Sequence, residues 1–133
     1  MPRISAATNA AQRENTKRAI LESFGQLLYS RGLPGLTMTD VAKNAGIGRT
    51  AVYNYFADMG ELLVAYALDE TERFLHELDE GLAGVTNPID QLAVYIRLQI
   101  EDLARRHLPP GPAMRSMLSP ESYARLGKHV SEL

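Results

Sequence analysis

The sequence predicts an all-α protein, and three observations support this fold class. Apolar residues recur at helical spacing along most of the chain. No segment shows the two-residue alternation with β-branched residues that is typical of a half-buried strand. Glycines and prolines fall between the periodic segments, where they separate one helix from the next. With 133 residues, the chain is long enough for one domain or for two small helical subdomains.

The first helix is expected from about Arg13 to Arg31. Its apolar stripe consists of Ile20, Phe24, Leu27 and Leu28. Gly32 should end this helix, because glycine adopts the left-handed conformation that follows a helix. Residues 1–12 have little apolar surface to bury, and we expect them to form a disordered tail.

Two short helices, over residues 38–44 and 49–56, are expected next, joined by a tight turn at Gly46. Thr37 should cap the first of them, and Asp40 lies where a capping box requires an acidic side chain. The second should bury Val52, Tyr55 and Phe56 and turn its polar residues outward. A helix this short is not stable alone, so we expect it to dock on its neighbours and present polar groups to the major groove of DNA.

A long fourth helix is expected over residues 59–82, with Asp58 as its cap. Its apolar stripe consists of Leu63, Ala67, Phe74, Leu78 and Leu82. Twenty-four residues make a helix of about 36 Å, which is long enough to connect two subdomains.

Asn87 and Pro88 predict the start of a fifth helix that extends to about residue 107. We expect it to be buried on more than one side, because apolar residues widen its main stripe. These are Leu92, Ile96, Ile100 and Leu103 on the stripe, with Ala93, Tyr95 and Leu98 beside it. A short helix over 113–118 and a last helix that starts at residues 119–121 complete the prediction.

Composition narrows the class of protein. Residues 1–59 carry seven basic and four acidic side chains, a balance of +3, whereas residues 60–133 carry seven and twelve, a balance of −5. A basic amino-terminal part is typical of a surface that binds a polyanion. The chain has no cysteine, which excludes disulfides and thiolate metal sites and fits a reducing cytoplasm. We find no apolar run that could span a membrane, no metal-ligand spacing and no pair of nucleophile and base, so neither an enzyme nor a cofactor is expected.

The residues around the two short helices resemble the TetR family of transcriptional regulators. The pattern consists of Ile20-Leu21, Phe24, Gly32, Thr37, Asp40-Val41-Ala42, Ala45-Gly46-Ile47, Val52-Tyr53, Tyr55-Phe56 and Glu61-Leu62-Leu63. It covers about residues 13–66. The resemblance implies a helix-turn-helix DNA-binding domain over 13–58, followed by a helical ligand-binding and dimerisation domain over 59–133.

The resemblance also implies which residues contact DNA. They are Thr37, Thr39, Lys43, Arg49, Thr50, Ala51, Tyr53, Asn54 and Tyr55. Arg49 could bind guanine O6 and N7 together, and Tyr53 could donate its hydroxyl to the DNA backbone. Tyr55 could instead belong to the core, and Asn54 could simply be solvated. The chain departs from the family at Gly48, where a capping side chain is usual, and at Met59-Gly60, where a basic–acidic pair is usual.

A ligand pocket is implied in the second domain. Its candidate residues are Phe74, Leu78, Leu92, Tyr95, Ile96, Met114, Met117 and Leu118, and ordinary core packing is the alternative for each of them. Family members carry two further long helices that form a dimer interface. We therefore expect this domain to be incomplete at its carboxyl end.

Together these expectations describe a cytoplasmic, ligand-responsive DNA-binding regulator that acts as a homodimer. In its simplest form it is a repressor released from a palindromic operator by a small apolar molecule, without metal, cofactor or membrane. The alternative is a helical protein–protein interaction module that keeps the fold without reading DNA.

Overall fold

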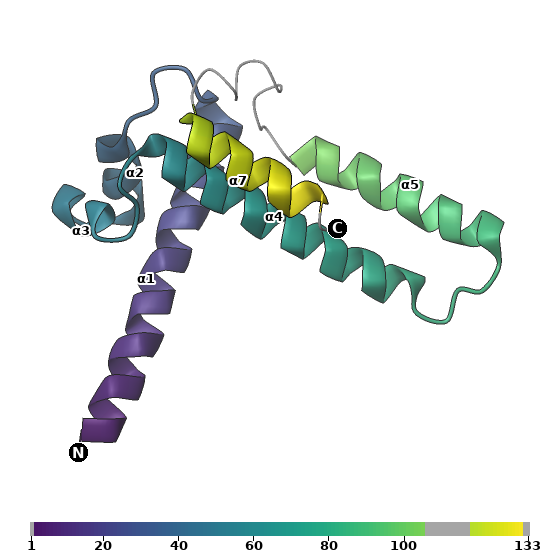
Figure 1. Cartoon of the computed structure of the whole chain (residues 1–133), viewed down its shortest axis with the longest axis horizontal. Coiled ribbons are helices and arrows are strands. Elements are labelled where there is room, and N and C mark those ends of the chain that lie inside the picture. Colours follow the sequence, from purple (N-terminus) through teal and green to yellow (C-terminus); the bar gives the residue numbers. More distant parts are fainter. Residues whose placement is uncertain (1, 106–117, 132–133) are drawn as a thin grey trace. The chain divides into compact units, whose positions relative to one another are not determined.

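The computed structural model describes residues 2–105 and 118–131, which form helices and, within these ranges, no strand (Figure 1). The helices are α1 Pro2–Arg31, α2 Met38–Ala45, α3 Arg49–Tyr53, α4 Met59–Leu82, α5 Pro88–Arg105 and α7 Pro120–Ser131. The predicted all-α class is confirmed. The chain divides into two compact units, Met1–Leu63 and Val64–Leu133, and α4 begins in the first and continues in the second. Most of the short helix expected over 113–118 lies outside the described residues.

Helix α1 begins at Pro2 and not near Arg13, so the expected start was wrong. Residues 2–12, for which we predicted disorder, continue the helix. Adding residues to an existing helix needs no new nucleation, and alanine has the highest helix propensity. This segment contains Ala6, Ala7, Ala10 and Ala11. The helix ends at Arg31 as predicted, and Gly32 follows with a φ of 74°.

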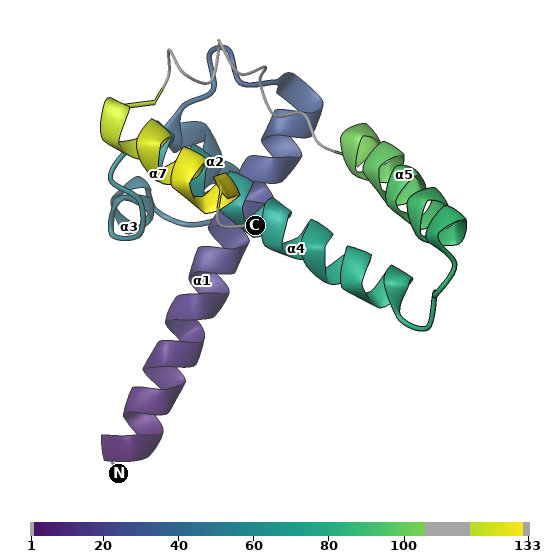
Figure 2. The ribbon, with the colours of Figure 1, turned by 45° about the vertical axis from the view of Figure 1, so that its right-hand side comes forward.

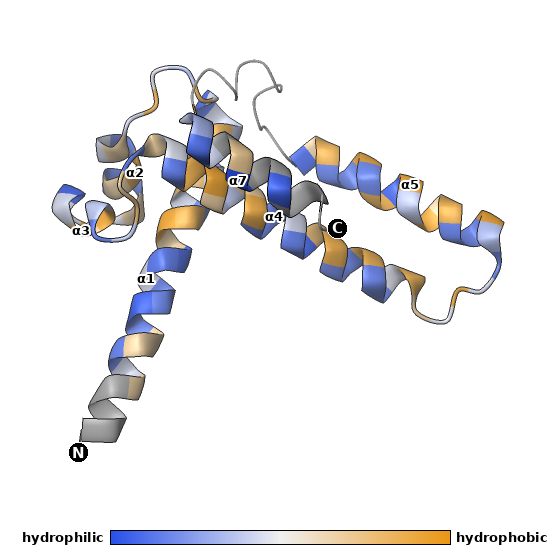
Figure 3. Cartoon of the chain, in the orientation of Figure 1, coloured by the Kyte–Doolittle hydropathy of each residue, from blue (hydrophilic) through white to orange (hydrophobic). Residues whose placement is uncertain are grey.

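The core of the first unit consists of side chains that are almost completely buried. They are Ile20, Phe24 and Leu28 on α1, Val41 on α2, Val52 on α3, and Leu62 and Leu63 on α4. Each such side chain contributes about 1.5–3 kcal/mol relative to an exposed one. Figure 3 shows the corresponding change along α1 from a hydrophilic amino-terminal part to an apolar segment.

A polar contact joins α2 to α1 within this core. The buried hydroxyl of Ser23 donates to the carbonyl oxygen of Val41 at 2.9 Å. The side-chain amide of Asn44 donates to the Ser23 hydroxyl oxygen at 2.9 Å and to Gln26 Oε1 at 3.1 Å. Because buried polar groups need partners, these bonds favour one placement of α2 on α1. The hydropathy pattern did not predict this contact.

In the second unit, α4 and α5 lie side by side and are joined by a short loop (Figures 1 and 2). A methyl group on Gly81 would lie 3.0 Å from Val94 Cγ1 and 3.3 Å from Leu98 Cδ1, so the helices approach closely there. The rings of Phe74 and Tyr95 meet edge to face, with centroids 6.5 Å apart. None of the described helices is long and apolar enough to cross a membrane.

The expected burial of α5 on more than one side was wrong. Leu92, Ile96, Ile100 and Leu103 are 58%, 47%, 63% and 69% exposed. The physical reason is the face that α5 turns toward α4. Val94 and Leu98, one turn apart, occupy that contact, and the main apolar stripe therefore points elsewhere.

Caps at the remaining helix ends agree with the prediction. The Asn87 side chain accepts a hydrogen bond from the N–H of Ile89 at 2.8 Å at the start of α5. Ser119 accepts from the N–H of Ser122 at 3.1 Å at the start of α7. Both bonds satisfy backbone donors that a helix leaves free in its first turn.

Candidate nucleic-acid interface

The start of α2 is fixed by a reciprocal cap. The N–H of Asp40 donates to Thr37 Oγ1 at 3.1 Å, and the N–H of Thr37 donates to Asp40 Oδ2 at 3.0 Å. The predicted capping box is thus confirmed. The hydrogen bond from the Thr37 backbone, with smaller effects of the Thr37 side chain, Arg31 and Lys43, holds the pKa of Asp40 below its usual value. The Asp40 side chain is therefore held in its charged form, with Arg31 and Lys43 as the nearby cations. Its Oδ2 lies 3.7 Å from Arg31 Nη1.

The turn between α2 and α3 depends on Gly46, whose φ is 73°. Its N–H and that of Ile47 bond back to the last turn of α2, and the distance from Ile47 N to Ala42 O is 3.0 Å. Only glycine adopts this left-handed conformation without strain. Gly48 then precedes α3 in an extended conformation. It has no side chain and therefore cannot cap the helix with one. The turn therefore determines the direction in which α3 leaves α2.

Helix α3 ends at Tyr53, earlier than the predicted end at residue 56. The N–H groups of Asn54 and Tyr55 bond to the carbonyls three residues earlier, at 3.2 and 3.0 Å. These shorter-range bonds tighten the chain into a turn. Phe56 follows this turn; its N–H bonds to Val52 O at 3.1 Å, and its side chain is only 3% exposed.

The surface of α2 and α3 carries the residues that the sequence assigned to DNA. Thr37, Thr39, Lys43, Arg49, Thr50, Tyr53 and Asn54 are exposed, whereas Ala51 and Tyr55 are half-buried. Val52 is fully buried beneath them. The structure thus places all the predicted contact residues on α2, its cap, α3 and the turn that follows α3.

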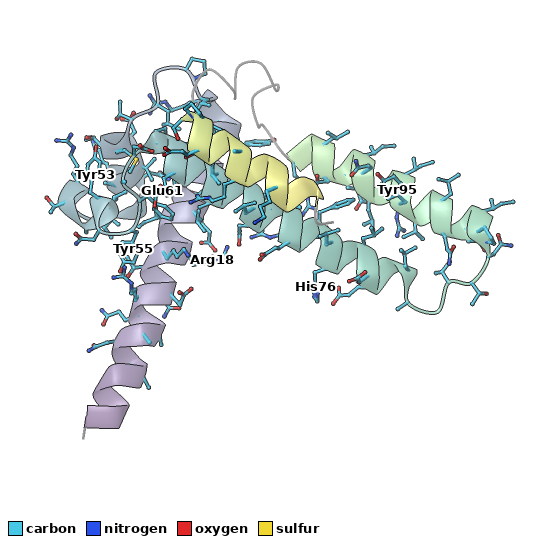
Figure 4. The ribbon with its side chains drawn as sticks, viewed as in Figure 1. Arg18, Tyr53, Tyr55, Glu61, His76 and Tyr95 are labelled. Atoms are coloured by element: carbon cyan, nitrogen blue, oxygen red, sulfur yellow. The ribbon has the colours of Figure 1, made fainter. Side chains whose placement is uncertain are left out.

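Two arginines lie over tyrosine rings at this surface. The Arg49 guanidinium carbon is 5.4 Å from the centre of the Tyr53 ring, and that of Arg13 is 4.7 Å from the centre of the Tyr55 ring. Figure 4 shows Tyr55 beside α1. Sequence reasoning missed Arg13 as part of this surface, because the pairing joins residues far apart in the chain. Tyr55 is half-buried, and its ring packs against the Arg13 guanidinium.

Two side chains also accept backbone hydrogen bonds at the beginning of α4. Asp58 Oδ1 accepts from the N–H of Glu61 at 2.8 Å, and Glu61 Oε2 accepts from the N–H of Ala57 at 3.3 Å. The predicted role of Asp58 is confirmed. Met59 and Gly60 are half-buried at this point and place no cation there.

The residues predicted to line a ligand pocket do not converge in the described part of the chain. Phe74 and Leu78 are half-buried on α4, and Phe74 contacts Tyr95. Leu92 and Ile96 are exposed because α5 turns another face toward α4. Leu118 is buried, and Met114 and Met117 lie outside the described residues.

A different hollow, of about 750 Å³, opens between α4 and α5. It is lined by Glu77, Glu80, Gly81, Leu98, Glu101, Ala104 and Arg105. Arg105 pairs with Glu77 at 2.9 Å, and this bond raises the pKa of the arginine. The hollow is therefore bordered by an ion pair, unlike the apolar pocket that we expected.

The geometry of the first unit defines a helix-turn-helix domain: a capped helix, a glycine turn and a short helix with an exposed polar face. Residues 17–66 match the family described as bacterial regulatory proteins, tetR family. The amino-terminal domain of this chain is thus similar to the DNA-binding domain of that family, as its sequence motif predicted.

One curated relative is an uncharacterised helix-turn-helix-type transcriptional regulator of Haemophilus influenzae. It is 36% identical over 74 residues, which are 55% of this chain and 36% of that protein. This chain thus spans about a third of the length of that relative.

Solved structures of TetR-family proteins share the fold. A regulator from Marinobacter aquaeolei superposes with a TM-score of 0.63 at 22% identity, over 92% of this chain and 67% of that one. The fatty acid degradation regulator FadR from Bacillus halodurans superposes with a TM-score of 0.67 at 19% identity, over 87% of this chain and 60% of that one. A regulator from Haemophilus influenzae superposes with a TM-score of 0.58 at 22% identity, over 68% of this chain and 50% of that one. An amino-terminal helix-turn-helix domain followed by a helical domain is thus the architecture of this chain.

Proposed function

We propose that this chain reads DNA through α3 as part of a ligand-responsive transcriptional regulator. The observation that carries the proposal is the division of α3 into two faces. Val52 is fully buried, whereas Arg49, Thr50 and Tyr53 are exposed on a helix too short to be stable alone. Such a helix presents polar groups at a fixed angle, which is what recognition of base edges requires.

Each exposed residue has a role in this proposal. Arg49 donates to O6 and N7 of a guanine, and the Tyr53 ring beneath it limits the directions its guanidinium can take. Tyr53 donates its hydroxyl to a phosphate. Thr37, Thr39, Lys43, Thr50 and Asn54 contact the DNA backbone or neighbouring bases, and Ala51 contacts a thymine methyl group. We add Arg13, which Tyr55 holds at the edge of the same surface, as a phosphate contact.

Binding of the full chain to DNA duplexes selected from a random pool tests this proposal, with fluorescence anisotropy as the readout. Arg49→Ala should weaken binding to the selected sequence by about 1–3 kcal/mol and relax its preference at one base pair. Tyr53→Phe should weaken binding less. Arg13→Ala should weaken binding to all sequences alike and lower the salt slope by about one.

Arg73→Ala provides a matched control, because it removes one arginine from the part of α4 that belongs to the second unit, and α2 and α3 belong to the first. We expect it to leave the sequence preference unchanged. Sequence-independent binding that survives both Arg49→Ala and Tyr53→Phe would refute the proposal.

We further propose that a small apolar molecule bound by the second unit releases the DNA, so that the protein acts as a repressor in the cytoplasm. Two facts support this: α4 is one continuous helix from the DNA-binding unit into the second, and one structural neighbour regulates fatty acid degradation. A ligand acts in this way only if it binds one conformation better than the other. Oleate serves as the probe, and an unchanged DNA affinity at saturating oleate would contradict this assignment.

A protein–protein interaction module is the second candidate function. It is favoured by the exposed apolar stripe of α5 and by the absence of a cation at Met59 and Gly60. The relatives of this chain are described as regulators, and neither candidate function is enzymatic. A steep decrease of DNA affinity with salt, together with sequence preference, would exclude this alternative.

A further inference from the structure

Three side chains connect α1 to the last turn of α2 through hydrogen bonds, and we call this group the Ser23–Asn44 link. Ser23 and Gln26 lie on α1, and Asn44 lies on α2. The amide nitrogen of Asn44 donates to Ser23 Oγ at 2.9 Å and to Gln26 Oε1 at 3.1 Å. The buried Ser23 hydroxyl donates in turn to the carbonyl oxygen of Val41, also on α2, at 2.9 Å. The series of bonds therefore starts on α2, passes through α1 and returns to α2.

The directions of these bonds fix α2 more narrowly than apolar contacts do. Burial of Val41 and Ala42 has no preferred direction, so it tolerates a small rotation of α2 about its axis. A hydrogen bond, in contrast, weakens steeply when its angle falls below about 120°. The bonds of the link must all be aligned at once, and an unpaired buried hydroxyl is costly. The Ser23–Asn44 link therefore selects one rotation of α2 on α1.

An ion pair between the same two helices restricts α2 less. Arg31 Nη1 lies 3.7 Å from Asp40 Oδ2, and the two side chains are 51% and 32% exposed. Ion pairs at a solvated surface contribute little and permit many geometries. This pair also lies in the first turn of α2, whereas α3 follows the last turn. The orientation of the end of α2 that leads into α3 thus depends on the link.

The glycine turn passes the orientation of α2 on to α3. The N–H groups of Gly46 and Ile47 both bond to the carbonyl oxygen of Ala42, so the turn moves together with α2. Recognition of base edges requires side chains placed within about 0.5 Å of the productive geometry. A small rotation of α2 is therefore sufficient to misplace Arg49 at the start of α3.

We propose that Ser23 and Asn44 are positioning residues that set the sequence preference of α3 without contacting DNA. The Asn44 amide is directed to oxygen atoms of α1, and the Ser23 hydroxyl is buried, so neither donor is offered to a base. This inference rests on the proposed reading of DNA by Arg49. It adds two residues that face α1 and α2 to those that determine which sequence is bound.

Two duplexes measure this role. One is the selected sequence, and the other differs from it at the base pair for which Arg49→Ala relaxes the preference. The ratio of their dissociation constants for the full chain, from fluorescence anisotropy, gives the sequence preference. Asn44→Ala and Ser23→Ala should each lower this ratio by about threefold to tenfold. The dependence of affinity on salt should stay unchanged, because the removed groups contact no phosphate.

Ser30→Ala and Ile20→Val are the matched controls. Ser30→Ala removes a hydroxyl that bonds within α1, to the carbonyl oxygen of Gln26 at 2.9 Å. Ile20→Val removes one buried methyl group, which lowers stability about as much as the loss of one hydrogen bond, and thermal unfolding checks this match. Both variants keep the link, so the ratio should not change. An equal reduction in Ile20→Val would assign the effect to stability and overturn the positioning role.

A cycle of single and double variants connects Asn44 to Arg49. Because Asn44 acts by placing Arg49, Asn44→Ala should lower the ratio no further in a chain that already carries Arg49→Ala. A further reduction of the full single-variant size would show that Asn44 acts independently of Arg49, and it would overturn the inference.

Residual dipolar couplings of the free chain test the orientation without DNA. Asn44→Ala should change the orientation of α3 relative to α1, and Ser30→Ala should not. Unchanged couplings in Asn44→Ala, or an unchanged ratio, would overturn the positioning role alone. A wild-type chain without sequence preference would refute the proposed function instead, and the couplings would still decide whether the link orients α3.

Discussion

At the scale of single residues, the helix-turn-helix depends on local side-chain chemistry. Thr37 and Asp40 cap α2 reciprocally, whereas Asp58 caps α4 and Glu61 accepts from the N–H of Ala57. Gly46 supplies the left-handed turn that no other residue adopts without strain. These contacts involve residues three or four apart, and they were therefore predictable from the sequence.

The lowered pKa of Asp40 predicts a pH dependence of stability. Because the folded chain holds the carboxylate in its charged form, its stabilising effect is present above the usual carboxyl pKa, and it is lost as the pH falls through the lower pKa of the folded state. Asp40→Asn should therefore be less stable than the wild type at neutral pH, and the difference should disappear well below about pH 4. Urea unfolding from pH 7 downward measures it; a difference that stays constant would show that charge is irrelevant.

At the scale of helices, packing decided what periodicity alone left open. Apolar residues surround much of α5, and its sequence pattern did not show which side would meet α4. Val94 and Leu98 lie opposite Gly81, whereas Leu92, Ile96, Ile100 and Leu103 are exposed. Glycine permits this close approach because it has no side chain, and a larger residue there would separate the helices.

Substitution of Gly81 tests this packing. Gly81→Leu should destabilise the α4–α5 pair by about 1–3 kcal/mol, because the new side chain has no space between Val94 and Leu98. Faster amide hydrogen exchange along α5 is the expected readout. Glu72→Leu is the control, since residue 72 is exposed on α4. Equal exchange in both variants would mean that the helices do not pack through Gly81.

At the scale of the whole molecule, the described residues contain one helix-turn-helix. A helix-turn-helix reads a half-site, so a palindromic operator requires two copies. The charge balance follows the same division, since residues 1–59 carry +3 and residues 60–133 carry −5. The basic part is suited to phosphates, while the acidic part is suited to contacts other than DNA.

The sequence by itself determined the all-α class, the main helix caps, the glycine turn and the resemblance to the TetR family, because these depend on residues close together in the chain. The bounds of α4 and the end of α1 agree with the prediction, and the exposed residues of α2 and α3 agree with their expected orientation. The roles of those residues in DNA binding stay predictions.

Only the tertiary structure decided the features that join distant residues. The ring of Tyr55 beneath Arg13, the bonds of Ser23 and Asn44 between α1 and α2, and the face of α5 that meets α4 all depend on packing. The end of α3 at Tyr53 was likewise not predicted by the sequence. Local chemistry starts and ends helices, whereas the fit between their surfaces selects which side is buried.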